Sequence, residues 1–172
     1  MKQELQKLFA DLHLFSNLVA NVRLSNLTFD VYHFKKADIE VDLIFAKKAQ
    51  FAHLQEAFSA LFKKELFDGE EWDIRDEPEP KDKQWLHSLQ EVWIKEYFLN
   101  KSMSMKVVDD DPFIARFQRD LRDVNAPESV VHELLLRLNN LEAIQMKQGH
   151  VYDYIFGQSE SEYFVFEWGI YV

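Results

Sequence analysis

The stretch that decides the fold runs from residue 27 to residue 46. It reads Leu-Thr-Phe-Asp-Val-Tyr-His-Phe-Lys-Lys-Ala-Asp-Ile-Glu-Val-Asp-Leu-Ile-Phe-Ala. Apolar residues alternate with polar ones on both sides of a short link, Lys35-Lys36-Ala37. Because a side-chain period of two is typical of half-buried strands, the stretch predicts a β-hairpin over residues 27–46.

The alternation also predicts how the two strands pair. The apolar sets of both strands fall on odd positions, and opposite residues of an antiparallel pair share a face. The residue numbers of each pair should therefore have an even sum, which excludes a two-residue turn at Lys35-Lys36 and leaves a loop of three or five residues. With Lys35-Lys36-Ala37 as the loop, Val31 lies opposite Val41, and Asp30 lies opposite Asp42.

The other face of this predicted hairpin is acidic and carries Asp30, Asp38, Glu40 and Asp42. One interpretation is a solvated face that tolerates repulsion between its carboxylates. The functional interpretation is a divalent-metal site or a patch for a basic partner.

One short motif bears on the metal interpretation. Residues 38–42, Asp-Ile-Glu-Val-Asp, put alternate carboxylates on one strand. In this the stretch resembles nucleotidyltransferases, and the resemblance, which covers only these residues, implies that such carboxylates hold Mg²⁺ against triphosphate oxygens. The corresponding hypothesis is a Mg²⁺-dependent nucleotidyl or phosphoryl transfer enzyme that uses Asp30, Glu40 and Asp42. The Gly-Ser turn that precedes the carboxylates in that family is replaced here by His33-Phe34-Lys35-Lys36.

The strongest shift in composition lies at residues 68–82. Pro78 and Pro80 interrupt any helix there, and Trp72 stands among the acids. One interpretation is a solvated connector. The other is a docking loop, because an aromatic residue beside clustered charges is typical of an interface. The candidate partner-binding residues are Asp68, Glu70, Glu71, Trp72, Asp73, Asp76, Glu77 and Glu79.

The whole composition limits the classes of function. A chain of 172 residues with 47% hydrophobic content suits one folded domain over residues 1–172. There is no cysteine, which excludes disulfides and thiolate metal sites. The net charge of −10 opposes nucleic acid and anionic lipid. No secretory signal and no membrane-spanning apolar run is visible, so we expect a cytoplasmic protein. We also expect no cofactor.

The remaining chain alternates helical and strand-like patterns. Helical periodicity predicts helices over 2–20, 47–67, 82–99, from 109 onward, and 127–146, with Asp82 as an N-cap. Residues 103–108 suggest a short strand, and residues 150–172 predict a second hairpin. We therefore expect an α+β fold, an antiparallel sheet built from the hairpins 27–46 and 150–172 and covered by about five helices.

Three functional hypotheses follow. The first is a non-enzymatic, acidic protein-binding module that occludes a basic partner; bacterial immunity proteins that neutralise toxins have this size and charge. The second is the Mg²⁺-dependent transfer enzyme described above. The third is an accessory or regulatory subunit of a larger complex.

Overall fold

The structure is a computed structural model that describes residues 1–68, 77–100, 103–149 and 151–171. Contacts between Cα atoms divide the chain into two compact units. The helical unit comprises residues 1–28 and 49–103, and the sheet unit comprises residues 29–48 and 104–172. The expectation of a single domain stays a prediction.

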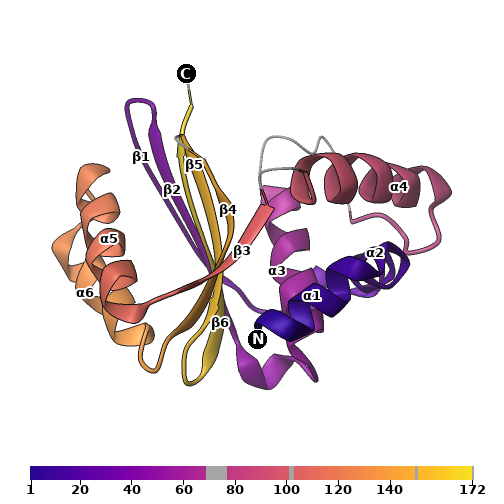
Figure 1. Cartoon of the computed structure of the whole chain (residues 1–172), viewed down its shortest axis with the longest axis horizontal. Helices are drawn as coiled ribbons and strands as arrows, with labels where there is room; N and C mark the ends of the chain where they lie inside the picture. Colours follow the sequence, from indigo (N-terminus) through magenta and orange to yellow (C-terminus); the bar gives the residue numbers. More distant parts are fainter. Residues whose placement is uncertain (69–76, 101–102, 150, 172) are drawn as a thin grey trace. The chain divides into compact units, whose positions relative to one another are not determined.

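The helical unit contains four α-helices and a π-helix among its described residues (Figure 1). The elements are α1 (Lys2–Ala10), α2 (Leu12–Asn21), the 3₁₀ turn η1 (Leu24–Asn26), α3 (Leu54–Asp68), α4 (Lys83–Ser88) and the π-helix η3 (Leu89–Phe98), with the 3₁₀ turn η2 (Lys48–Gln50) before α3. Asp82 caps α4 as predicted, since its side chain accepts hydrogen bonds from the backbone N–H groups of Gln84 and Trp85. The predicted helix 82–99 changes to the wider π-helix after Ser88.

The predicted helix 2–20 is two helices because Asp11 interrupts it. Asp11 has extended backbone angles, and its side chain accepts a hydrogen bond from the N–H of Leu14, which starts α2. Aromatic rings hold these helices to α3 and η3, and the ring centroids of Phe62 and Phe98 are 5.0 Å apart. Phe15 and Phe58 lie in the same cluster, at 5.7 Å, so the helical unit is stabilised largely by aromatic packing.

The sheet unit is built on one antiparallel sheet with the strand order β1-β2-β6-β5-β4-β3. Its elements are β1 (Asp30–Lys36), β2 (Ile39–Lys47), β3 (Met103–Val108), α5 (Asp110–Asp123), α6 (Glu128–Arg137), β4 (Glu142–Gln148), β5 (Tyr152–Gln158) and β6 (Glu162–Ile170). Both predicted hairpins and the strand at 103–108 are present. The α+β class is confirmed.

The strand β4 was not predicted, because residues 127–146 carry a continuous helical pattern of apolar residues. Helix α6 ends at Arg137, and Asn140 then adopts a left-handed backbone with φ of 53°. Asparagine tolerates this conformation better than most residues, so Asn139-Asn140 is the stop signal that the apolar pattern obscured.

One face of the sheet packs against α5 and α6 (Figure 1). We call this the helix-side face, and the opposite side of the sheet the second face. Odd-numbered residues of β2 point into the helix-side core, as predicted for that strand. The fully buried side chains of this core include Val41, Leu43, Phe45, Phe113, Phe117, Leu121, Leu134, Ala143, Phe164 and Phe166.

The predicted register of the first hairpin is wrong. The paired residues have an odd sum, as in Phe34 with Val41 and Asp30 with Phe45. The turn has two residues, Ala37 and Asp38, and Ala37 takes the left-handed φ of 52° without the usual glycine or asparagine.

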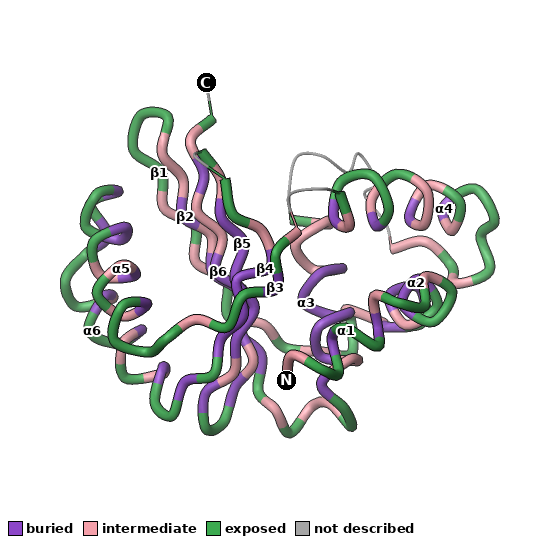
Figure 2. The backbone as a smooth tube through the Cα atoms, in the orientation of Figure 1, coloured by how far each residue is buried: buried purple, intermediate pink, exposed green. Residues whose placement is uncertain are grey.

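This register reverses the faces of β1. Tyr32 and Phe34 pack against the helix-side core, while Val31 is 44% exposed. Along β1 the backbone is coloured as exposed or intermediate (Figure 2). The error arose because β1 carries apolar residues at both odd and even positions, so its alternation did not define one face. The predicted opposition of Asp30 and Asp42 is therefore also wrong.

The second hairpin shows the same reversal. Ile155 of β5 lies opposite Phe166, whereas Tyr154 lies opposite Glu167. In the sequence, the even spacing of Tyr154 and Phe156 and of Phe164 and Phe166 predicts that these four residues share one face, and the register shows that they do not. Both faces of β5 are buried, so apolar character alone did not identify its side toward the helices.

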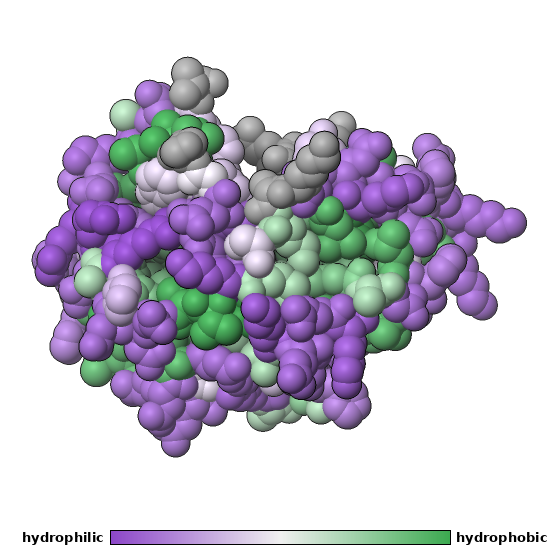
Figure 3. Space-filling model, in the orientation of Figure 1, coloured by the Kyte–Doolittle hydropathy of each residue, from purple (hydrophilic) through white to green (hydrophobic). Residues whose placement is uncertain are grey.

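Hydrophilic residues make up much of the surface seen in Figure 3, with apolar residues in smaller patches between them. Among the described residues, no helix has the length and apolar character required to cross a membrane.

Candidate functional site

The acidic segment 68–82 is described at its two ends only. Glu70, Glu71, Trp72, Asp73 and Asp76 lie outside the described residues. Asp68, Glu77 and Glu79 are described, and each carboxylate contacts a cation of the same unit.

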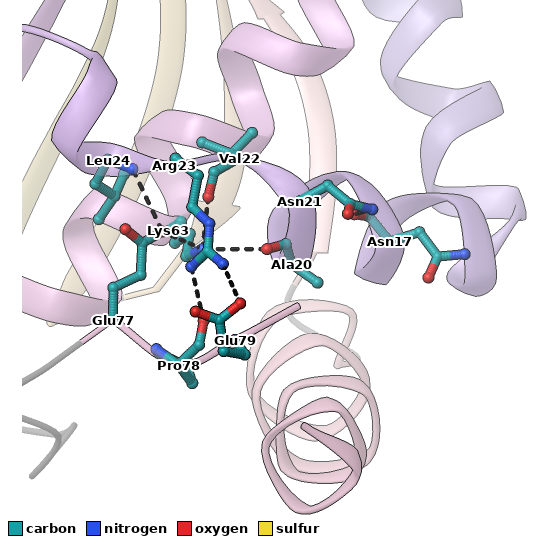
Figure 4. Close-up of polar contacts among 10 residues, drawn as sticks. All are labelled: Asn17, Ala20, Asn21, Val22, Arg23, Leu24, Lys63, Glu77, Pro78 and Glu79. Carbon is teal, nitrogen blue, oxygen red and sulfur yellow. Dashed lines mark hydrogen bonds and ion pairs between the residues drawn. The ribbon is translucent and has the colours of Figure 1, made fainter. Parts of the chain in front are cut away.

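Glu77 pairs with a lysine inside the helical unit (Figure 4). The Nζ of Lys63 lies 2.6 Å from Oε1 of Glu77, and the Lys63 side chain is fully buried. Lys63 also donates to the carbonyl of Val22 at 2.7 Å, at the end of α2. It lies 5.2 Å from the ring centroid of Trp85. With the Ala20 carbonyl at 3.4 Å as well, the ammonium group is surrounded by one carboxylate, two carbonyls and an aromatic face.

This environment changes the titration of Lys63. Burial lowers the pKa of its ammonium group, and the neighbouring Glu77 carboxylate acts in the opposite direction. Removal of water disfavours the charged amine, and an adjacent anion favours it. Glu77 is thus the group that makes a buried charge at Lys63 tolerable.

Arg23 holds the next acid of the segment (Figure 4). Its guanidinium donates to the Pro78 carbonyl at 3.1 Å and to Oε2 of Glu79 at 2.6 Å. Asp68, at the other end, pairs with Lys64 one helical turn earlier, at 2.6 Å. The described acids of the predicted docking loop are therefore engaged within the chain.

The acids of the first hairpin do not gather on one face. Asp30 lies on the helix-side face and accepts from Arg137 at 2.8 Å, beside Glu162. Glu40 and Asp42 lie on the second face, because they alternate with the core residues of β2. Asp38 lies in the turn. The sheet thus separates Asp30 from the two acids with which the magnesium hypothesis groups it.

The second face instead brings together side chains from three strands. His33 of β1 lies beside Asp42 of β2, and Asp42 lies opposite Glu167 of β6. The Nδ1 of His33 is 2.6 Å from Oδ1 of Asp42. We call the set His33, Lys35, Glu40, Asp42, Glu167 and Tyr171 the polar cluster; within it Lys35 pairs with Glu40.

Tyr171 completes the polar cluster from just beyond β6. Its backbone N–H donates to the Asp38 carbonyl at 2.7 Å, and its hydroxyl donates to Oε1 of Glu167 at 3.0 Å. A Cβ atom at Gly169 would lie 2.6 Å from the Tyr171 ring. Glycine at 169 therefore lets the ring lie across β6 towards Glu167.

The surroundings of Tyr171 favour its neutral hydroxyl, first through burial and then through nearby carboxylates. Burial raises the pKa of its phenol, and the Glu167, Asp42 and Glu40 carboxylates raise it further. A phenolate would stand among three carboxylates, so the neutral hydroxyl is favoured.

Sequence reasoning missed His33, Glu167 and Tyr171. With an even-sum register, His33 faces the helices and Asp30 appears to stand beside Asp42. The two-residue turn at Ala37-Asp38 reverses this assignment, and Ala37 gives no sequence signal for such a turn.

The chemistry of the polar cluster suits organic cations. Among the described residues there is no group of three or more histidine, aspartate or glutamate side chains that could hold a metal ion. Carboxylates spread over neighbouring strands can accept hydrogen bonds from lysine or arginine side chains of another molecule.

A second feature is a groove in the helical unit beside α2. Leu14, Leu18 and Val22 line it, with His53 and Glu56 among its polar residues. Glu56 accepts a hydrogen bond from the backbone N–H of Ala52 at 2.9 Å, just before α3. This contact explains Glu56 as part of the start of that helix.

No protein-family model, curated protein or solved structure matches this chain.

Proposed function

We propose that this protein is a binding module that docks a basic protein partner, in the manner of an immunity or inhibitor protein that occludes a toxin. The observation that carries the proposal is the direct opposition of Asp42 and Glu167 across β2 and β6, with Glu40 beside them. Like charges opposite each other destabilise a sheet. His33 contacts Asp42 and Lys35 contacts Glu40, so the cluster already binds basic groups of its own chain. A partner that supplies further cations at this place would reduce the repulsion between the strands.

The charge of the chain supports the same proposal. A net charge of −10 accelerates encounter with a basic molecule and weakens encounter with nucleic acid. The acidic residues Glu70, Glu71, Asp73 and Asp76, with Trp72 as an apolar anchor, form the second proposed contact. Glu77 and Glu79 then serve mainly to fix the end of that segment, through Lys63 and Arg23.

The test compares partner capture by matched charge variants. The wild-type chain should capture a basic protein, and Asp42→Asn/Glu167→Gln should lose at least about tenfold in affinity for it, since a few charge contacts of about 1 kcal/mol are removed. The control Asp111→Asn/Glu160→Gln changes the net charge equally at two exposed acids outside the polar cluster. Equal affinity in all three proteins would remove the polar cluster from the proposal.

The acidic segment has its own variant. Trp72→Ala should weaken capture of the same partner without changing the thermal unfolding midpoint, because an interface aromatic contributes mainly to binding. Unchanged affinity would remove this segment from the interface. The identity of the captured protein separates a toxin from a stable subunit of a complex, for which the chain would be an accessory component.

The magnesium hypothesis has a direct test. A protein that binds a metal in its folded state is stabilised by that metal. Thermal melts with and without millimolar Mg²⁺ or Mn²⁺ should therefore show no shift if the chain acts as a binding module. A reproducible upward shift, lost in Asp42→Asn, would favour the transfer enzyme instead.

A further inference from the structure

The outer edge of β1 has a sequence that is complementary to itself. β1 is an end strand of the sheet, so among the described residues it has a strand neighbour on one side only. It reads Asp-Val-Tyr-His-Phe-Lys-Lys over residues 30–36. Its charges lie at opposite ends, and His33 lies at its centre.

We propose that two copies of this chain associate through antiparallel pairing of β1 with β1 of the second copy, about a two-fold axis at His33. Pairs in this register have residue numbers that sum to 66. Asp30 then faces Lys36 of the second copy, and Tyr32 faces Phe34. By symmetry each of these pairs occurs twice, as an isologous interface requires.

The backbone geometry of the hairpin fits this register. In a two-residue hairpin the residues that flank the turn form the closing hydrogen-bonded pair, here Lys36 and Ile39. Even-numbered residues of β1 therefore direct their N–H and C=O groups to β2, and residues 31, 33 and 35 direct theirs outward. His33 would exchange two hydrogen bonds with His33 of the second copy.

The exposed side chains fit as well. Asp30 and Lys36 are both exposed, although Asp30 contacts Arg137 and Lys36 donates to Asn125. In the proposed register Val31, which is 44% exposed, lies beside the aliphatic stem of Lys35 from the second copy. Aromatic pairs across neighbouring strands stabilise a sheet, and Tyr32 beside Phe34 supplies two of them.

The lysines of β1 select this register rather than preventing pairing. Lysine on an edge strand usually blocks association because it meets like charge or apolar surface. A shift that brings Lys35 opposite Lys35 would have this effect. In the proposed register Lys36 meets Asp30 and Lys35 meets Val31, so the ends attract.

The first test measures the mass of the full-length chain in solution. Sedimentation velocity from about 1 μM to about 1 mM should show the mass doubling with concentration. Lys36→Glu should weaken association by about tenfold, because both Lys36–Asp30 pairs become repulsive. The control Lys36→Arg, which keeps the charge, should retain it. A single monomer mass over the whole range would overturn the proposal.

The second test reads the register by cross-linking, which the cysteine-free chain makes simple. Cα atoms of a hydrogen-bonded antiparallel pair lie about 5.5 Å apart, within the reach of a disulfide. His33→Cys should therefore form a covalent dimer under mild oxidation. Val31→Cys and Lys35→Cys should not cross-link alone but should cross-link when mixed.

The mixed experiment also guards against misfolding of the His33 variant, and circular dichroism establishes that each variant keeps the wild-type fold. Cross-linking of Val31→Cys alone at the rate of the mixture would contradict the register. Absence of cross-links in all folded variants would contradict the dimer itself.

Discussion

The carboxylates of two acidic regions in this protein differ in the groups that they contact. At the end of the acidic segment, Glu77 and Glu79 each contact a cation of the helical unit, one of them the fully buried Lys63. On the second face of the sheet, Asp42 and Glu167 lie opposite each other, and the Tyr171 hydroxyl donates a hydrogen bond to Glu167. The first arrangement stabilises the fold. In the second, the carboxylates of Glu40, Asp42 and Glu167 share two basic side chains, His33 and Lys35, which is why we place the proposed function there.

The largest expected effect tests the stabilising role of Glu77. Glu77→Ala should lower the free energy of unfolding by about 3 kcal/mol, because it leaves the Lys63 charge buried without its carboxylate. Urea unfolding measures the loss. Glu79→Ala is the matched control, since its carboxylate is 83% exposed and pairs with Arg23, and it should cost less than about 1 kcal/mol. Equal losses would mean that the two acids do not differ as described.

A smaller effect of opposite sign is expected in the polar cluster. Glu167→Gln keeps an acceptor for the Tyr171 hydroxyl and removes the charge opposite Asp42, so it should raise the free energy of unfolding by about 0.2–1 kcal/mol. The same unfolding measurement at low and high salt checks the cause, because screening should reduce the gain. A destabilised variant would show that Glu167 contributes to the fold.

The smallest effect on stability concerns the alkaline range. The folded protein holds the Tyr171 proton more tightly than the unfolded chain, whose phenol has a pKa of about 10. Its contribution is therefore complete below about pH 10 and is lost as the pH rises further. Stability measured from pH 9 to about pH 11 should fall less in Tyr171→Phe than in wild type.

A spectroscopic reading of the same residue needs no unfolding. Absorbance at the phenolate wavelength, compared between wild type and Tyr171→Phe, isolates the titration of Tyr171. Gly169→Ala should displace the Tyr171 ring, because the new Cβ would overlap it, and should return its pKa towards about 10. An unchanged titration in that variant would contradict the placement of the ring.

The sequence predicted the helices and strands better than it predicted which face of each strand is buried. Strand alternation in Ile39–Lys47, the Asp82 cap and the second hairpin were sufficient to predict the α+β class. The register was not predictable from β1, because Val31 and Phe34 give opposite answers about which side is buried. The decisive feature, left-handed Ala37, has no residue signature.

The same dependence on strand register limited the prediction of the candidate site. Glu40 and Asp42 were recognised as a pair on one strand, but their neighbour His33 depends on the register of the first hairpin, and Glu167 depends on the pairing of β2 with β6, which is distant in sequence. Long-range pairing is the part of a fold that local patterns specify least. The role of Glu77 was similarly hidden, since only the fold shows that Lys63 is buried next to it.

The enclosure of Lys63 has a practical consequence for following motion in this protein. An amine covered on all sides escapes acylating reagents until its surroundings open. Its labelling rate, read by mass spectrometry against the exposed Lys95, would report how often residues 77–79 separate from the helices. Acylation of Lys63 would therefore follow the opening of the segment that we propose to contact a partner.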